Sequence, residues 1–294
     1  MSARKIRKAI LPVAGLGTRV LPATKAIPKE MLPVFDRPAI QYVVDEARAA
    51  GIEHIVFVTG RNKAAIEDYF DRAYELESSL REKQKTDLLR ELAAFTPTAG
   101  SMSFVRQQEA LGLGHAVWCA RDVVGDEPFA VLLPDMLTMG SSPCLQQMVE
   151  AYEKVGGGNV IAVEPTDNPS AYGIVAPGRR DGRIMEMVGM VEKPKREEAP
   201  SNLFITGRYI LQPEIFGFLA SQDKGAGGEI QLTDSMARLM KEQKFHALEY
   251  DGRSYDCGDK IGYLTATAAF ALANAQFGPA AAAALSACLE TRRK

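Results

Sequence analysis

Short apolar runs alternate with segments of helical period through the first half of the chain. The pattern predicts strands at residues 8–14, 54–59, 101–107 and 129–134, and helices at residues 39–50, 63–76, 113–123 and 143–154. Strands that alternate with helices are typical of a doubly wound, mostly parallel sheet. Because ligands bind such sheets beyond the carboxyl ends of the strands, residues that follow a strand are the first candidates for a functional site.

The rhythm changes after residue 155, where strands follow one another closely. Strands are expected at residues 159–164, 173–176, 183–192, 204–211 and 245–250, with helices at 229–242 and from Lys260 onward. Asp181-Gly182 is one of the turn signals that separate the strands. No linker marks a boundary, so we predict one α/β domain over residues 1–294: a doubly wound, Rossmann-like mixed β-sheet flanked by helices.

Residues 78–95 interrupt this pattern with leucines at helical spacing among many charges. A stripe of this kind is a packing surface. We therefore predict an inserted amphipathic helix that packs on the core or contacts another subunit and takes no part in chemistry.

Composition narrows the partners and the compartment. A net charge of −2 gives the molecule no general positive field, which argues against nucleic acid as a partner. The four cysteines lie far apart without a C-x-x-C pair, so neither a zinc site nor a disulfide framework is expected. No apolar run reaches membrane-spanning length, and the N-terminus lacks a secretory pattern. We expect a protein of the reducing cytoplasm that binds no membrane.

A glycine loop with cations follows the first predicted strand, in the sequence A-G-L-G-T-R that begins at Ala14. Glycines let backbone N–H groups approach an anion, and Arg19, Lys25 and Lys29 add positive charge, so the loop suits a polyphosphate. It is not a dinucleotide fingerprint, because Val20 stands where the third glycine would be, and it lacks the Gly-Lys-Ser/Thr of a Walker A loop. The alternative is a structural turn whose basic residues are merely solvated.

The motif G-x-G-T-R followed by P-K-E-M-L-P resembles the signature of sugar-nucleotide pyrophosphorylases, which are nucleotidyltransferases. The motifs G-L-G-H-A, L-P-D, Y-G-I and V-E-K-P extend the resemblance from Ala9 to about Tyr263 and are similar to those of bacterial UTP–glucose-1-phosphate uridylyltransferases. The resemblance implies transfer of the uridylyl group of UTP to glucose 1-phosphate, giving UDP-glucose and pyrophosphate. It also implies Mg²⁺ dependence and a homo-oligomer, either a tetramer or a dimer.

Two alternatives stay open on the sequence alone. A thymidylyltransferase for the same sugar phosphate is the nearest enzyme, although such enzymes typically carry K-Q-L-L-P where this chain has K-E-M-L-P. The other is a catalytically silent paralogue that regulates an active enzyme. On the resemblance, residues 1–155 form mainly the nucleotide-binding half, residues 156–258 mainly the sugar-phosphate-binding half, and residues 259–294 a C-terminal helical region.

The resemblance assigns the glycine loop and two later motifs to the nucleotide. Arg19 would contact the β- and γ-phosphates and Lys29 the α-phosphate or the leaving group, which makes both catalytic candidates. Gln107 would pair with the pyrimidine edge through its amide, whereas His115 is expected to pack. The remaining nucleotide-binding candidates are Ala14, Gly15, Gly17, Thr18, Lys25, Glu30 and Gly112.

Two aspartates are candidate metal ligands. Asp135 follows the apolar run of residues 129–134, so a buried strand would deliver its carboxylate to the ligand edge. A strand-end aspartate is often only a turn residue, but the L-P-D motif matches the family's metal ligand, so Asp135 is expected to hold Mg²⁺ and to be catalytic. Asp256 is expected to be the second ligand. Asp259 competes for that assignment unless it only caps the next helix.

The V-E-K-P motif marks the sugar-phosphate site on the same resemblance. Lys193, the fourth catalytic candidate, would neutralise the acceptor phosphate, and Glu192 would accept hydrogen bonds from sugar hydroxyls. Gly173 would allow close backbone approach, and Thr206-Gly207-Arg208-Tyr209 is expected to line the far wall. For Glu192 and Lys193 the alternative is an ordinary solvated pair at the end of a strand.

Overall fold

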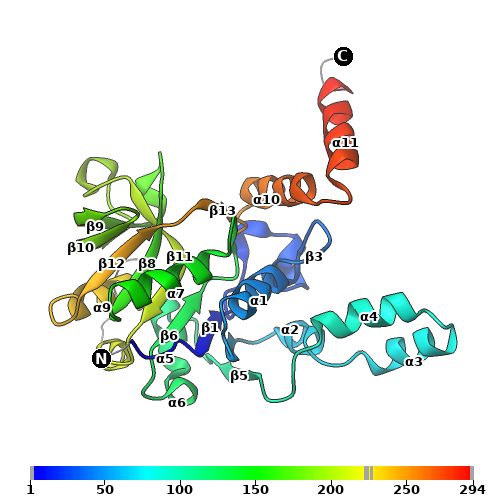
Figure 1. The fold of residues 1–294 in the computed structure, drawn as a ribbon, viewed down its shortest axis with the longest axis horizontal. Helices are drawn as coiled ribbons and strands as arrows, with labels where there is room; N and C mark the ends of the chain where they lie inside the picture. Colours follow the sequence, from blue (N-terminus) through cyan, green and yellow to red (C-terminus); the bar gives the residue numbers. More distant parts are fainter. Residues whose placement is uncertain (1–2, 222–224, 226–227, 292–294) are drawn as a thin grey trace.

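The computed structural model describes residues 3–221, 225 and 228–291 (Figure 1). In that part of the chain a mixed sheet of nine strands runs through both halves, in the order β5-β4-β1-β6-β11-β8-β12-β10-β9. Its strands are β1 (Lys8–Pro12), β4 (His54–Thr59), β5 (Met102–Arg106), β6 (Phe129–Leu132), β8 (Asn159–Pro165), β9 (Gly173–Asp181), β10 (Ile184–Glu192), β11 (Leu203–Leu211) and β12 (Phe245–Glu249). Two short ribbons are formed by β2 (Pro33–Val34) with β3 (Arg37–Pro38), and by β7 (Met136–Gly140) with β13 (Gly252–Asp256).

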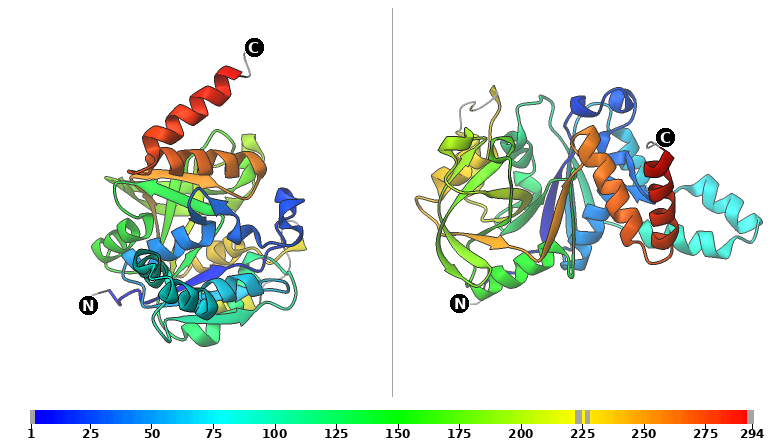
Figure 2. Two further views of the ribbon diagram at one scale, coloured as in Figure 1. Left: turned by 90° about the vertical axis from the view of Figure 1, so that its right-hand side faces the viewer. Right: turned by 90° about the horizontal axis from the view of Figure 1, so that it is seen from above.

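Helices cover both faces of this sheet (Figure 2). One face packs against α1 (Ala39–Ala49), α2 (Ala64–Tyr69), α7 (Cys144–Lys154) and α10 (Lys260–Ala273). The other face packs against α5 (Leu113–Cys119), α6 (Arg121–Val124), α8 (Ile215–Ala220) and α9 (Leu232–Leu239). In β1, Ala9 and Leu11 join the first core and Ile10 joins the second, because successive side chains of a strand point to opposite faces. The predicted fold class is confirmed.

The strand order creates a switch point next to β1. β1 pairs in parallel with β4 on one side and with β6 on the other, and β4 pairs in parallel with β5. The chain therefore leaves β1 in one direction across the sheet and later returns to its opposite side. Segments that follow β1 and β6 consequently lie at the same carboxyl edge, which is where open α/β sheets bind ligands.

The second half continues the sheet with antiparallel pairs. β11 runs antiparallel to both β6 and β8, and β10 runs antiparallel to β9 and β12, while β12 and β8 are parallel. The expected strands are all present, although β9 extends five residues beyond the predicted 173–176. β7, β13 and α8 were not predicted. The division of the chain into three functional parts stays a prediction.

Several predicted helices are divided. The helix expected at 63–76 is α2 followed by the start of α3 (Tyr74–Glu82), and the helix expected at 113–123 is α5 followed by α6. The segment 78–95 forms α3 and α4 (Thr86–Phe95), separated where Gln84 adopts a left-handed φ of 56°. Neither α3 nor α4 contains a buried residue, and the pair extends from the body (Figure 1). Of the two roles predicted for this segment, packing on the core is therefore wrong, and contact with another subunit stays a prediction.

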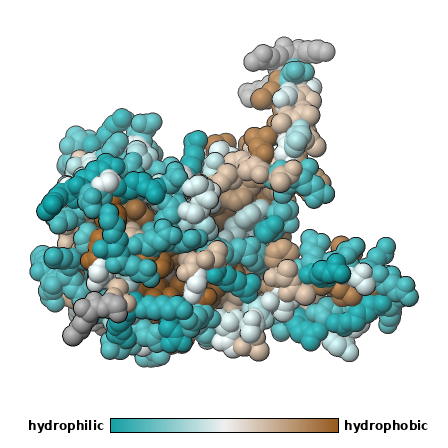
Figure 3. Space-filling view, in the orientation of Figure 1, coloured by the Kyte–Doolittle hydropathy of each residue, from teal (hydrophilic) through white to brown (hydrophobic). Residues whose placement is uncertain are grey.

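The C-terminal region forms α10 and α11 (Gly278–Thr291), and α11 extends away from the sheet (Figures 1 and 2). Both helices expose apolar side chains (Figure 3). Among the described residues, no helix is both long enough and apolar enough to cross a membrane.

Candidate active site

The glycine loop folds back on itself after β1. Gly17 has a left-handed φ of 67°, and Thr24 Oγ1 donates a hydrogen bond to the Gly17 carbonyl at 2.7 Å. A Cβ atom at Gly17 would lie 3.2 Å from the Thr24 side chain and 3.3 Å from the Lys29 side chain, so glycine lets the loop close this tightly. The same folding brings Lys29 against Gly15, whose ideal Cβ position lies 3.8 Å from Lys29 Cε.

Lys29 meets Asp135 across the switch point between β1 and β6. Lys29 Nζ lies 2.5 Å from Asp135 Oδ2, and both side chains are mostly buried. Burial is the largest single influence on each pKa and opposes the charged form, but the partner's opposite charge and the hydrogen bond between the two groups, with smaller contributions from neighbouring groups, together outweigh it. The pKa of Asp135 is consequently held below its ordinary value, and the pKa of Lys29 is raised. The site thus keeps a carboxylate and an ammonium ionised side by side at neutral pH.

A tight turn between β6 and β7 presents Asp135. The Met136 amide donates to the Leu133 carbonyl at 3.3 Å, and Pro134 occupies the second position of the turn, where its fixed φ is favourable. The Asp135 carbonyl accepts a hydrogen bond from the Cys257 amide at 2.7 Å. This bond ties the turn to the segment that follows β13.

Asp256 lies beside Asp135 because β13 pairs with β7, with Asp256 opposite Met136. Its Oδ1 accepts from the Gly258 amide at 2.7 Å, and its Oδ2 accepts from Tyr172 Oη at 3.3 Å. Burial raises the pKa of Asp256; the Gly258 hydrogen bond lowers it, and the neighbouring Asp135 carboxylate raises it further. A cation shared by the two carboxylates would relieve this repulsion.

The donor set at this edge suits Mg²⁺. Within the described part of the chain, no group of three or more His, Cys, Asp or Glu side chains comes together as a metal site. Mg²⁺ usually needs only one or two protein carboxylates, because substrate phosphates and water complete its coordination. Asp135 and Asp256 supply that number.

Because Gly258 has no side chain, Arg19 can lie beside Asp256. A Cβ atom at Gly258 would lie 2.5 Å from Arg19 Nη2 and 2.7 Å from Asp256 Oδ1, so a side chain there would displace both groups. Arg19 is exposed and makes no ion pair with any described residue, which leaves its charge available to an anion.

Asp259, the competing candidate for the second metal ligand, accepts hydrogen bonds at 2.9 Å from two first-turn amides of α10. Its interpretation as a helix cap is confirmed.

Glu30 lies beneath the glycine loop. Its side chain is 1% exposed and accepts a hydrogen bond from Lys63 Nζ at 2.8 Å. Burial raises the pKa of Glu30 against the opposing charges of Lys63 and Lys29. The sequence pointed to Glu30 but not to Lys63. In the sequence pattern, Lys63 looks like any other lysine that precedes a helix.

Lys29, Asp135 and Asp256 form the first corner of the site. Gln107 and His115 form the second corner. Gln107 Nε2 donates to the Gly112 carbonyl at 3.1 Å and to His115 Nδ1 at 3.0 Å. Because an amide nitrogen only donates, His115 Nδ1 accepts and the ring is neutral. Burial lowers the pKa of His115, which favours the same form. Gln107 Oε1 accepts no hydrogen bond from the described residues and is the group that Gln107 offers to a ligand.

Gly112 lets the second half of the chain approach this corner. Its φ is 103°, and a Cβ atom there would lie 2.7 Å from Glu229 Cβ and 2.9 Å from the Ile230 carbonyl. The Ile230 amide also donates to the Leu111 carbonyl at 2.7 Å. The segment that leads into α9 is thereby held against the Gln107 corner.

Glu192 and Lys193 form the third corner, at the end of β10. Glu192 pairs in register with Gly173, where a Cβ atom would lie 3.0 Å from Glu192 Oε2. The same oxygen accepts a hydrogen bond from Thr233 Oγ1 at 2.7 Å, so the carboxylate is fixed. Lys193 has a left-handed φ of 45°, and its amide donates to the Tyr172 carbonyl at 3.0 Å. Its side chain is 56% exposed, and Tyr172 joins this corner to the aspartate pair.

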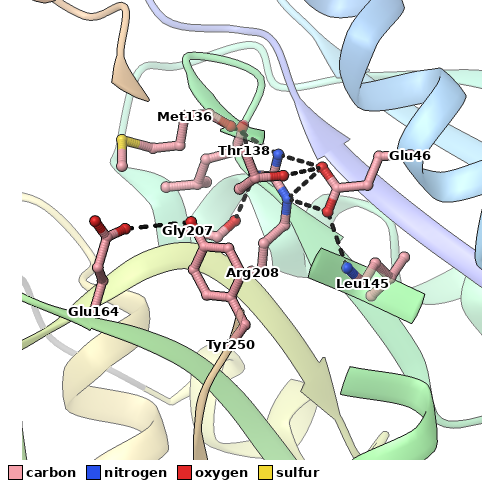
Figure 4. Close-up of polar contacts among 9 residues, drawn as sticks. Glu46, Met136, Thr138, Leu145, Glu164, Gly207, Arg208 and Tyr250 are labelled. Atoms are coloured by element: carbon pink, nitrogen blue, oxygen red, sulfur yellow. Dashed lines mark hydrogen bonds and ion pairs between the residues drawn. The ribbon is translucent and has the colours of Figure 1, made fainter. Parts of the chain in front are cut away.

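The prediction for residues 206–209 is wrong for three of the four positions. Thr206 donates to a backbone carbonyl of β8, Tyr209 packs in the core, and Arg208 is fully buried and paired with Glu46 (Figure 4). All nine positions of β11 are buried, because the strand lies inside a sheet that is covered on both faces. Gly207, with a φ of 76°, has only its backbone to offer a ligand.

Comparison with known proteins adds independent findings. Residues 8–272 match the family model described as Nucleotidyl transferase. The UTP–glucose-1-phosphate uridylyltransferase 2 of Staphylococcus saprophyticus is 53% identical over 271 residues, which cover 92% of this chain and 93% of that protein.

Solved structures show the same likeness. A UTP-bound UGPase from Acinetobacter baumannii gives a TM-score of 0.85 at 46% identity, covering 93% of this chain and 96% of its own. A UDP-glucose pyrophosphorylase complexed with UDP-glucose gives 0.81 at 41% identity, covering 90% and 98%. The similarity therefore extends over both halves of the sheet.

Proposed function

The chain belongs to the nucleotidyl transferase family, and we propose that it transfers the uridylyl group of UTP to glucose 1-phosphate, giving UDP-glucose and pyrophosphate. The observation that carries the proposal is the meeting of Lys29 and Asp135 at the switch point, with Arg19 beside Asp256 at the same edge. The names of the relatives and the UTP and UDP-glucose in the two solved structures support this choice of substrates.

The glycine loop holds the triphosphate in this proposal. Arg19 neutralises the β- and γ-phosphates, and Lys29 stabilises charge at the α-phosphate or the leaving pyrophosphate. Glu30 supports the loop from below through Lys63. The remaining contacts come from Ala14, Gly15, Gly17, Thr18 and Lys25.

The sugar phosphate binds at the third corner. Lys193 neutralises its phosphate, and Glu192, held by Thr233, accepts hydrogen bonds from sugar hydroxyls. Gly173 and Gly207 allow the backbone to approach the sugar. A phosphate oxygen of glucose 1-phosphate then attacks the α-phosphorus of UTP in line, and the bond to pyrophosphate breaks. Catalysis comes from positioning and electrostatics, with no covalent enzyme intermediate.

Asp135 and Asp256 hold Mg²⁺ in this proposal. The bound ion supplies charge neutralisation at the phosphate oxygens. The chain itself fixes both carboxylates: Lys29 and the β6–β7 turn orient Asp135, while Tyr172 and the Gly258 amide orient Asp256.

Base selection follows from the hydrogen bonds of Gln107. Because Nε2 is engaged by Gly112 and His115, Gln107 presents Oε1, an acceptor, to the base. Uracil and thymine carry an N3–H donor that matches it, whereas N3 of cytosine is an acceptor and would leave Oε1 unpaired.

A matrix of nucleoside triphosphates against sugar 1-phosphates tests the function. We expect UDP-glucose from UTP and glucose 1-phosphate, weaker use of dTTP, and little use of CTP, ATP or GTP, with product identified by mass spectrometry. Preference for dTTP would favour the thymidylyltransferase. Absence of turnover with every pair would favour the silent paralogue.

We also propose a homo-oligomer, either a tetramer or a dimer. α11 projects from the body, and α10, α11 and the link between them expose apolar side chains that a second copy would cover: Ile261, Leu264, Leu272, Phe277, Leu285 and Leu289. Light scattering on a size-exclusion column tests the mass.

All four cysteines are free thiols, which supports the cytoplasm as the compartment.

A further inference from the structure

Arg208 makes an unusually complete set of contacts for a buried arginine (Figure 4). Its guanidinium binds Glu46 through Nε and Nη2 at 2.8–3.1 Å. Nη1 donates to the Leu133 carbonyl at 3.1 Å and to the Gly207 carbonyl at 3.2 Å, and Nη2 donates to the Met136 carbonyl at 2.7 Å. The Arg208 side chain thus donates hydrogen bonds to one carboxylate and three backbone carbonyls.

Two of those carbonyls lie at the ends of the β6–β7 turn that presents Asp135. Leu133 and Met136 are the first and last residues of the turn whose centre is Pro134–Asp135. Arg208 therefore holds both ends of the segment that presents the Asp135 carboxylate. The Gly207 carbonyl also accepts from the Leu133 amide at 2.9 Å, so three hydrogen bonds join β11 to the turn.

Glu46 anchors this arginine from the other side. It comes from α1, and its oxygens also accept hydrogen bonds from Thr138 Oγ1 in β7 and from the Leu145 amide in the first turn of α7, both at 3.0 Å. Unpaired amides at a helix start need such acceptors. The pair thus connects α1, β7 and α7 to the turn through Arg208.

A buried ion pair is weak evidence for stability by itself, because an apolar pair of similar volume often stabilises as well. What an apolar pair cannot supply is donors for the turn carbonyls. A lysine keeps the charge but lacks the planar fork that reaches several acceptors at once.

We propose that Arg208 and Glu46 are positioning residues that set the geometry of Asp135, and through it the binding of the divalent cation, without touching substrate. The inference rests on the proposed function for the role of Asp135. It departs from the sequence-based expectation, in which Arg208 lined the sugar site.

The test compares Arg208→Lys with the wild type and with Val124→Ala, a core truncation in α6 on the opposite sheet face. Three quantities are measured on the full-length protein: Mn²⁺ affinity in the presence of UTP by electron paramagnetic resonance, the Mg²⁺ concentration for half-maximal activity, and amide hydrogen exchange over residues 130–140. We expect Arg208→Lys to weaken both metal responses about tenfold or more and to speed exchange in the turn. Val124→Ala should change only the melting temperature.

The double variant Arg208→Met with Glu46→Leu removes both charges and covers the case in which Arg208→Lys does not fold. It should show the same weakened metal responses and faster exchange. Wild-type Mn²⁺ affinity and exchange in a folded Arg208 variant would overturn the inference. Wild-type protein that forms no UDP-glucose would contradict the proposed function instead, and the exchange measurement, which needs neither metal nor substrate, would still decide the positioning role.

Discussion

Lys29 Nζ and Asp135 Oδ2 lie 2.5 Å apart although 106 positions separate the two residues in the chain. Parallel pairing of β1 with β6 brings the segments after both strands to one edge of the sheet. The charge of Lys29 then holds the pKa of Asp135 below its ordinary value despite burial. The strand order of the sheet thus fixes an ionised carboxylate beside a cation at the candidate reaction centre.

Asp135→Asn should fold and lose most of its activity. The amide keeps the size of the side chain but removes the charge that would bind Mg²⁺ and pair with Lys29, and removal of one such group typically costs about a hundredfold or more in rate. Initial rates of UDP-glucose formation at saturating substrates measure the effect. Asp122→Asn, at a side chain that is 83% exposed, is the matched control and should behave as wild type. Normal turnover in Asp135→Asn would remove Asp135 from the mechanism.

The same mutant should lose an acid-sensitive part of the stability. Since the folded pKa of Asp135 lies below the unfolded one, ionised Asp135 stabilises the fold at neutral pH, and this contribution disappears as pH falls through the carboxyl range.

Most of the fold could be predicted from local sequence patterns, because β1 and β4 are continuous apolar runs and α1 carries apolar residues at helical spacing. β7 and β13 were missed because both are only partly buried, so neither shows the continuous apolar run of a buried strand.

The candidate site was less predictable from the sequence. Motifs identified Lys29, Asp135 and Lys193, since short loops beside strands carry recognisable residues. The position of Arg208 could not be read in this way, because a basic residue after a glycine looks the same whether it faces ligand or core. Glu46 carried a signal in the sequence, because it is a charged residue among the mostly apolar positions of the buried face of α1.

Lys193→Ala and Arg19→Ala should separate the two substrate sites. Both side chains are exposed cations, but Lys193 lies beside Glu192 and Arg19 lies beside Asp256. We expect Lys193→Ala mainly to raise the KM for glucose 1-phosphate, and Arg19→Ala mainly to impair the triphosphate step through kcat and the KM for UTP. Full kinetic profiles with each substrate varied in turn measure the difference. Indistinguishable profiles would contradict the assignment.

Gly173→Ala should disturb the third corner, where Glu192 and Lys193 lie. The new Cβ atom would lie 3.0 Å from Glu192 Oε2 and 3.1 Å from Ile205 Cδ1, so the carboxylate must shift. We expect the KM for glucose 1-phosphate to rise about tenfold, equivalent to about 1.4 kcal/mol, while the KM for UTP stays unchanged. Gly217→Ala, where a Cβ atom meets nothing within 4 Å, is the control. Equal KM values in the two variants would show that Glu192 does not contact the sugar.

His115 should make both stability and UTP binding sensitive to acid. Burial lowers the pKa of His115, so the unfolded chain takes up the proton first as pH falls. The stability that neutral His115 contributes is therefore present above about pH 6.5 and declines as pH is lowered below that value. Thermal melts of the wild type over this range measure the decline.

Protonation of His115 also removes the acceptor that holds Gln107 Nε2. The Gln107 amide then loses its fixed orientation, and we expect the KM for UTP to rise from neutral pH down to about 5.5. UTP itself takes up a proton in this range, so His115→Phe, which can keep the stacking on Trp118 but cannot titrate, measures that contribution separately. The variant should start from a higher KM, because it lacks the acceptor at every pH, and should vary less with acid. If the two pH profiles of KM run parallel, His115 does not control the base-binding amide, and Gln107 must be oriented by Gly112 alone.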